Sequence, residues 1–111
     1  MAMATFIHDG KSIDHTPPAD VPAGAVVVQG ELVGVAKTPI AAAALGSLAV
    51  EGVFDFAKAT GAGTAIAAGA NCYWKADPGV VSVDSQDGKL IGKCVKAAAD
   101  ADATARVRLS Q

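Results

Sequence analysis

Apolar and polar residues alternate along much of the chain with a period of two, which is typical of β-strands. The clearest alternation runs over residues 48–56 and predicts one strand with a buried face. That face comprises Leu48, Val50, Gly52, Phe54 and Phe56. The segment before it, residues 31–37, is apolar on both sides and has small residues on one of them, which predicts a strand against which another element packs closely.

Further short apolar segments, separated by turn signals, predict the remaining strands. They are residues 25–29, 71–76, 80–83, 89–95 and 104–109. Residues 38–45 have helix-forming composition after Thr38-Pro39, but the flanking strands leave room for only a loop with at most one short helix. The pattern therefore predicts an all-β fold, a small single-domain β-barrel or β-sandwich.

Two parts of the chain resemble each other at an offset of 58 residues. The segment Leu32-Val33-Gly34-Val35-Ala36 matches Leu90-Ile91-Gly92-Lys93-Cys94, and an alanine triplet follows each, at 42–44 and 97–99. A closing strand comes after both triplets. We interpret these as two related units of strand, alanine-rich turn and strand; the alternative is chance similarity in an alanine-rich chain.

The first 23 residues have the character of an extended N-terminal arm, and residues 24–111 that of a β-rich core domain. Phe6, Ile7 and Ile13 are the large apolar residues of the arm, and Thr16-Pro17-Pro18 stiffens its path. A segment with so little to bury is expected to lie on its own domain, a neighbouring subunit or a partner. The alternative to such a docking arm is a flexible terminus that binds nothing.

Composition points toward burial on another molecule. Hydrophobic residues make up 51% of the 111-residue chain but aromatic residues only 5%, so much of the apolar content is alanine, which buries little area. Such a chain is a candidate for self-association or for binding a larger partner. Neither a signal peptide nor an apolar run long enough to span a bilayer is visible, which predicts a cytoplasmic protein that does not enter a membrane.

The charges do not suggest a nucleic-acid partner. The net charge is −2, and the nearest thing to a basic cluster is a set of residues near the C-terminus that we expect to decorate a solvated sheet face. They are Lys89, Lys93, Lys96, Arg106 and Arg108. Cys72 and Cys94 are too few and too far apart in sequence for a zinc site, and we expect both to be buried and reduced.

Residues with catalytic, metal-binding or cofactor-binding patterns are not apparent. The glycine-rich segment 58–70 lacks the Gly-Lys-Ser/Thr of a phosphate loop, and its glycines do not match the dinucleotide fingerprint. Ser47 lacks the nucleophile-elbow pattern, and the two histidines, His8 and His15, lie in the arm. We therefore expect a protein that is not an enzyme and that binds neither a metal nor a cofactor.

Taken in order, the motifs of the chain resemble those of phage capsid cement, or head decoration, proteins, a family of small phage proteins often labelled as RecA/RadA-type recombinases. The matching motifs are Phe6-Ile7, Asp9-Gly10, Ile13-Asp14, Val26-Val27, residues 32–36, Gly52-Val53-Phe54, Tyr73-Trp74, residues 90–92 and residues 106–109. Lys93 and Lys96 depart from the pattern, which has small or apolar residues there. The recombinase label conflicts with the absence of a phosphate loop.

The resemblance implies a structural virion protein that binds the outside of the expanded head and stabilises it against the pressure of packaged DNA. Its partners would be the major capsid protein and other copies of itself, as a homotrimer, after assembly in the host cytoplasm. We place the capsid or subunit contact at Phe6, Ile7, Asp9, Ile13 and Trp74. The alternative is a small β module that binds a ligand or host factor in a pocket near Trp74; an enzyme is the third class.

Overall fold

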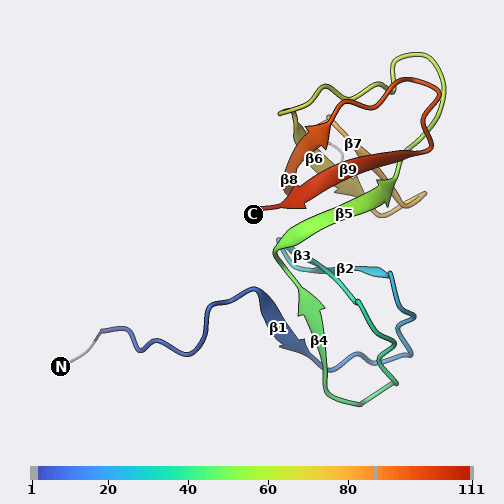
Figure 1. Ribbon diagram of the computed structural model, residues 1–111. Coiled ribbons are helices and arrows are strands. Elements are labelled where there is room, and N and C mark those ends of the chain that lie inside the picture. Colours follow the sequence, from blue (N-terminus) through green and yellow to red (C-terminus); the bar gives the residue numbers. More distant parts are fainter. Residues whose placement is uncertain (1–2, 87, 111) are drawn as a thin grey trace.

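The computed structural model describes residues 3–86 and 88–110, and every regular element within them is a β-strand. The strands form two antiparallel sheets (Figure 1). The N-terminal sheet has the order β1 (Ser12–His15), β4 (Gly46–Ala49), β3 (Leu32–Val35), β2 (Val26–Gln29). The C-terminal sheet has the order β5 (Gly52–Ala57), β9 (Thr104–Leu109), β8 (Lys89–Lys96), β6 (Asn71–Lys75), β7 (Val80–Ser82). The all-β prediction is confirmed.

The main core joins the two sheets, which makes the architecture sandwich-like rather than a closed barrel. Val33 and Val35 of β3 pack into a cluster whose other members belong to the C-terminal sheet and its loops. At its margin the Phe56 and Trp74 rings lie with centroids 5.9 Å apart. A smaller cluster within the N-terminal sheet is formed by Ala36, Ile40 and Leu48, with Ile13, Val21 and Val27 packed against it. Of the two predicted architectures, the sandwich is therefore the better description.

The alternation over residues 48–56 belongs to two strands, so the prediction of one continuous strand was wrong. β4 ends at Ala49 and β5 begins at Gly52, and the chain passes from one sheet to the other between them. Gly52 has φ +121°, a conformation that glycine adopts without the penalty other residues incur. The period of two indicates which side chains face inward, but it does not reveal where the chain passes from one sheet to the other.

The alanine-rich turn after β3 contains no helix despite its composition. Ala43 has φ +63°, and its N–H donates to the carbonyl of Pro17 at 2.8 Å. The N–H of Ala42 donates to Asp20 Oδ1, also at 2.8 Å. Backbone donors that would begin a helix are thus bound by the preceding chain, and these tertiary hydrogen bonds override the local helix propensity.

The two sheets repeat one topology. The N-terminal sheet reads β1-β4-β3-β2, and the C-terminal sheet reads β5-β9-β8-β6 with β7 added at one edge. In both, the first strand pairs with the closing strand of the unit: Ile13 lies opposite Leu48, and Phe54 lies opposite Val107.

Hydrogen bonds outside the strands repeat as well. Isolated bridges join Val21 to Ile40 and Ile66 to Ala98. Close to each bridge, a glycine N–H donates a hydrogen bond of 2.6 Å to a backbone carbonyl. Gly24 donates to Ala36, just after β3, and Gly69 donates to Cys94 of β8. Ile40 and Ala98, like Ala36 and Cys94, differ by 58. The structure therefore confirms the two related units and indicates an internal duplication.

The N-terminal region divides into two parts. β1 pairs along its length with β4, and Val21 forms its bridge with Ile40, so residues 12–21 contact the N-terminal sheet. Residues 3–11 extend away from both sheets, as Figure 1 shows at the blue end of the chain, except that the carbonyl of Lys11 at their base accepts a hydrogen bond from the N–H of Val50. We call residues 3–11 the projecting segment.

Candidate interaction surfaces

The projecting segment carries three large apolar side chains in solvent, those of Met3, Phe6 and Ile7. Phe6 and Ile7 are each 78% exposed, and Asp9 beside them is exposed. The N–H of Gly10 donates to His8 Nδ1 at 2.9 Å, and Gly10 has φ +75°, so a turn ends the segment before β1. Exposed aromatic and branched side chains on an extended strand-like segment are suited to binding a surface that this chain does not itself provide.

The other two residues predicted for the contact lie differently. Ile13 is half-buried on β1 and packs against the small cluster around Leu48. Trp74 is half-buried on β6 and packs on Phe56 at the margin of the main core. The structure therefore does not bring the five predicted residues together: Phe6, Ile7 and Asp9 share the projecting segment, whereas Ile13 and Trp74 belong to separate cores.

Beside Trp74 there is a hollow of about 440 Å³. Its lining includes Trp74, Lys75 and Lys89 of the C-terminal sheet and Val28 of the N-terminal sheet. Lys89 reaches across the two sheets to Glu31, with Nζ 2.7 Å from Oε1. The hollow is the place where the alternative prediction of a ligand module would locate a ligand.

The glycine-rich segment after β5 is held by its own chain rather than open to an anion. The N–H groups of Thr64 and Ala65 donate to Asp100 Oδ1 at 3.1 and 2.8 Å. Lys58, only 5% exposed, donates from Nζ to the carbonyl of Ala59 and to Thr64 Oγ1. The backbone donors that a phosphate-binding loop would present to its ligand are thus occupied by a carboxylate.

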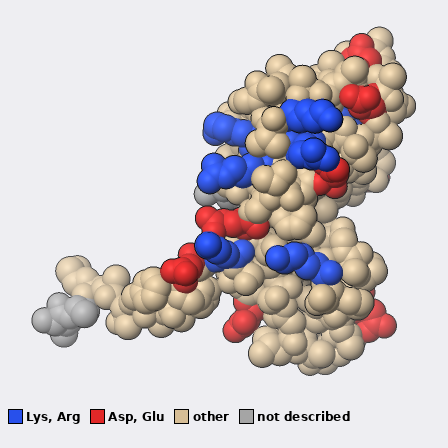
Figure 2. All heavy atoms as spheres, in the orientation of Figure 1, with Lys and Arg blue, Asp and Glu red and all other residues tan. Residues whose placement is uncertain are grey.

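The outer surface of the C-terminal sheet carries four exposed cations on two adjacent strands. Lys93 lies directly opposite Arg108, and Lys96 lies directly opposite Arg106. We call Lys93, Lys96, Arg106 and Arg108 the cationic face. Figure 2 shows Lys and Arg side chains gathered over this half of the molecule, while Asp and Glu are dispersed.

A β-bulge brings Lys96 onto this face. The register of β8 against β9 shifts between Cys94 and Lys96, which leaves Val95 as an extra residue. In a regular strand without the bulge, Lys96 would share the inward orientation of Cys94, because side chains two apart on a strand face the same way. The bulge therefore re-aims the lysine toward solvent beside Lys93.

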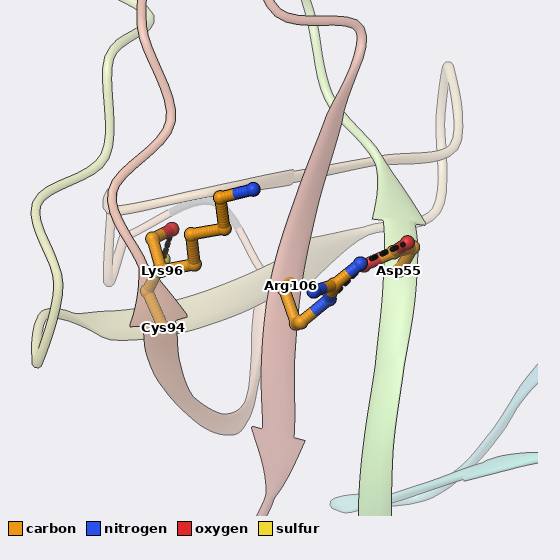
Figure 3. Close-up of polar contacts among 4 residues, drawn as sticks. All are labelled: Asp55, Cys94, Lys96 and Arg106. Carbon is orange, nitrogen blue, oxygen red and sulfur yellow. Dashed lines mark hydrogen bonds and ion pairs between the residues drawn. The ribbon is translucent and has the colours of Figure 1, made fainter.

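A single carboxylate on the neighbouring strand pairs with the cationic face. Arg106 donates from Nε to Asp55 Oδ1 at 2.9 Å and from its terminal nitrogen to Oδ2 at 3.2 Å, across β9 and β5 (Figure 3). This hydrogen bond lowers the pKa of Asp55 below its ordinary value, so the carboxylate stays ionised at neutral pH. The charge of Lys96, which lies opposite Arg106 on β8, contributes to this lowering of the pKa of Asp55 as well.

The two cysteines are buried and free, as the sequence predicted. The Cys94 thiol lies 3.0 Å from the carbonyl oxygen of Lys96, as Figure 3 shows. Burial, together with the neighbouring Cys94, raises the pKa of Cys72 to about 11 from an ordinary 9.0. Both groups act as small apolar residues of the core.

Neither cysteine is expected to react readily with a thiol reagent in the folded protein. A pKa near 11 lowers the thiolate fraction of Cys72 about a hundredfold relative to an ordinary thiol, and burial adds a steric barrier. Titration with an aromatic disulfide at pH 8 should detect fewer than one thiol per chain within minutes, and two in denaturant. Rapid reaction of either thiol in the native protein would show that the C-terminal sheet opens easily.

Two further features are absent from residues 3–86 and 88–110. No helix there is long and apolar enough to cross a membrane. In the same ranges, histidine, cysteine and acidic side chains form no group of three that could hold a metal ion.

Comparison with known families gives a match over most of the chain. The family model of the phage cement proteins matches residues 7–109. The chain belongs to the phage cement protein family. Comparisons with curated proteins and with solved structures gave no significant match. Family membership implies a structural role in the phage capsid, and it confirms the predicted relationship.

For a cement protein the two surfaces of interest are the projecting segment and the cationic face. The first was predicted from its isolated apolar residues. The second was predicted only as a solvated decoration that also included Lys89, which the structure instead places in an ion pair with Glu31 at a distance from the other four. The four positively charged residues at 93, 96, 106 and 108 are visible in the sequence. The pairing of β8 with β9, which brings them together, is not.

Proposed function

We propose that this cement protein binds the outer surface of the expanded phage head and stabilises it against the pressure of packaged DNA. The observation that carries the proposal is the family match over residues 7–109. The role is mechanical rather than catalytic, and the major capsid protein is the partner. The protein would be assembled onto heads in the host cytoplasm and remain on the virion surface.

The projecting segment supports this role as the first point of attachment. Phe6 and Ile7 expose most of their surface in the isolated chain, and burying each on a partner is worth about 1.5–3 kcal/mol. An extended segment of this kind adds to the edge of a partner sheet through its backbone hydrogen bonds. We assign the contact to Phe6, Ile7 and Asp9, while Ile13 anchors β1 to the body.

Repetition over the head makes modest single contacts sufficient. Association of three copies around a local threefold position of the shell would link several capsid subunits at once. Each further contact then forms at a high effective concentration, so the three associated copies dissociate from the head far more slowly than one copy would. A contact geometry that exists only between expanded subunits would restrict binding to mature heads.

The proposal is tested by sedimenting purified protein with undecorated expanded heads and, separately, with unexpanded procapsids. Saturable cosedimentation with expanded heads only is the expected result, together with a higher temperature of head disruption after decoration. Light scattering of the protein alone would establish its state of association.

The absence of binding to either particle would overturn the proposal. Attention would then move to the hollow beside Trp74, where a ligand module would hold its ligand. That alternative predicts a monomer whose tryptophan fluorescence changes on ligand binding.

A further inference from the structure

The charges of this chain are strongly polarised. The cationic face holds four of the nine Lys and Arg residues, and its neighbour Asp55 is one of the eleven Asp and Glu residues. These four cations and one anion give the surface a net charge of +3. The remaining five cations and ten anions give the rest of the chain −5. An acidic protein thus presents one surface of the opposite sign.

Strand pairing places these cations next to one another. Lys93 faces Arg108 and Lys96 faces Arg106 across the β8–β9 ladder, and like charges directly opposite each other destabilise a sheet. Asp55 pairs with Arg106 and also attracts Lys96, but its single charge offsets only one of the four cations. The arrangement is unfavourable for the isolated protein, and it becomes favourable when carboxylates of a partner lie over it.

The duplication shows that this charge is not a requirement of the fold. The pair Lys93–Arg108 has Val35–Ala49 as its counterpart in the N-terminal sheet. There both residues are apolar and buried, and Val35 packs in the main core. The same position in one repeated topology is therefore covered by the chain itself in the first unit, and exposed and charged in the second.

The cationic face adjoins the base of the projecting segment. Gly10 and Arg108 line one shallow hollow, and Lys11 and Arg108 line another, at the junction of the two sheets; the acidic Glu51 lines both. A partner bound by Phe6 and Ile7 would therefore lie close to Arg108. The two features form one continuous surface.

Acidic residues of a second copy are poorly suited to cover this surface. Asp20 and Asp100 accept hydrogen bonds from backbone N–H groups of other loops, Asp102 accepts one within its own turn, and Glu31 pairs with Lys89. They lie on different turns of both sheets. Four of the ten remaining carboxylates are thus already engaged and dispersed, which favours an acidic surface on another protein over one on a second copy.

From these observations we infer that the cationic face docks onto a carboxylate-rich surface of the major capsid protein. The inference rests on the proposed function and adds the chemistry of the partner site. The projecting segment supplies apolar contact, and the cationic face supplies orientation and rapid association through long-range attraction. Attachment should therefore weaken as salt screens the charges.

The test compares the double variant Lys93→Gln/Lys96→Gln with the unaltered protein in binding to undecorated expanded heads at several salt concentrations. At low salt the variant should bind about tenfold more weakly, and its affinity should depend less on salt. Its melting temperature should equal or exceed that of the unaltered protein, because two like-charge pairs are relieved. A loss of binding therefore cannot be ascribed to unfolding.

Lys75→Gln/Lys89→Gln is the matched control, since it removes two lysines from the same sheet at the hollow beside Trp74. Its affinity for heads should stay within about twofold of the unaltered protein. Equal affinity and equal salt dependence for all three proteins would overturn the inference and leave the proposed function intact. A variant that changes self-association by light scattering, without changing head affinity, would also overturn it. Failure of the unaltered protein to bind heads at all would overturn both.

Discussion

Replacement of Gly92 with alanine is expected to destabilise the protein by at least about 3 kcal/mol, a large fraction of the stability of a domain this size. Gly92 lies on β8 opposite Leu109 of β9, and a Cβ at this position would overlap the carbonyl oxygen of Arg108. The obstacle is backbone rather than a side chain that can rotate, so the two strands would have to separate. Chemical denaturation, followed by Trp74 fluorescence, measures the effect.

Gly61→Ala is the matched control for this change. Gly61 has φ +119°, but a Cβ there would meet no heavy atom within 4 Å. Its substitution therefore introduces backbone strain without overlap and should cost about 1 kcal/mol. Similar losses for Gly61→Ala and Gly92→Ala would mean that β8 and β9 do not approach as closely at Gly92 as the structure shows.

The double variant Phe6→Ser/Ile7→Ser is expected to lower affinity for expanded heads roughly a hundredfold, because it removes the apolar area that the partner would bury. Its melting temperature should not change, since both side chains are 78% exposed. Sedimentation with heads measures the affinity, and calorimetry measures the stability. Deletion of residues 1–10 should have the same effect and retain β1, which a deletion of residues 1–20 would remove.

Leu45→Ser/Val83→Ser provides the control for surface hydrophobicity. These side chains are 72% and 51% exposed but lie outside the projecting segment. Their replacement should leave head affinity within about twofold. A loss as large as that of the Phe6/Ile7 variant would indicate that general apolar exposure, and not the projecting segment, governs attachment.

The strands of the C-terminal sheet were predicted closely because their patterns are local. β9 has the predicted bounds, and Ala105, Val107 and Leu109 are buried while Arg106 and Arg108 are exposed. Alternation of this kind arises from burial of one side of a strand, so it is readable without knowing the partner strand. The burial of Cys72 and Cys94 was predictable for a related reason, the small apolar character of a reduced thiol.

The candidate surfaces were predicted unevenly. Phe6 and Ile7 stand apart from any other apolar segment, and the structure exposes them. Ile13 and Trp74 carry the same kind of signal, yet neighbouring elements pack against both. Whether a large apolar side chain meets its own core or solvent depends on which elements return to it in space, and no local pattern encodes that.

The sequence by itself determined that this protein is all-β and which family it belongs to, and it suggested two related units, which the repeated strand topology then confirmed. These properties follow from periodicity and from the order of motifs along the chain. The tertiary structure alone decided that residues 48–56 divide between two sheets and that a bulge at Val95 turns Lys96 outward beside Lys93. Pairing between strands distant in sequence sets both, because register and sheet membership are properties of two strands together.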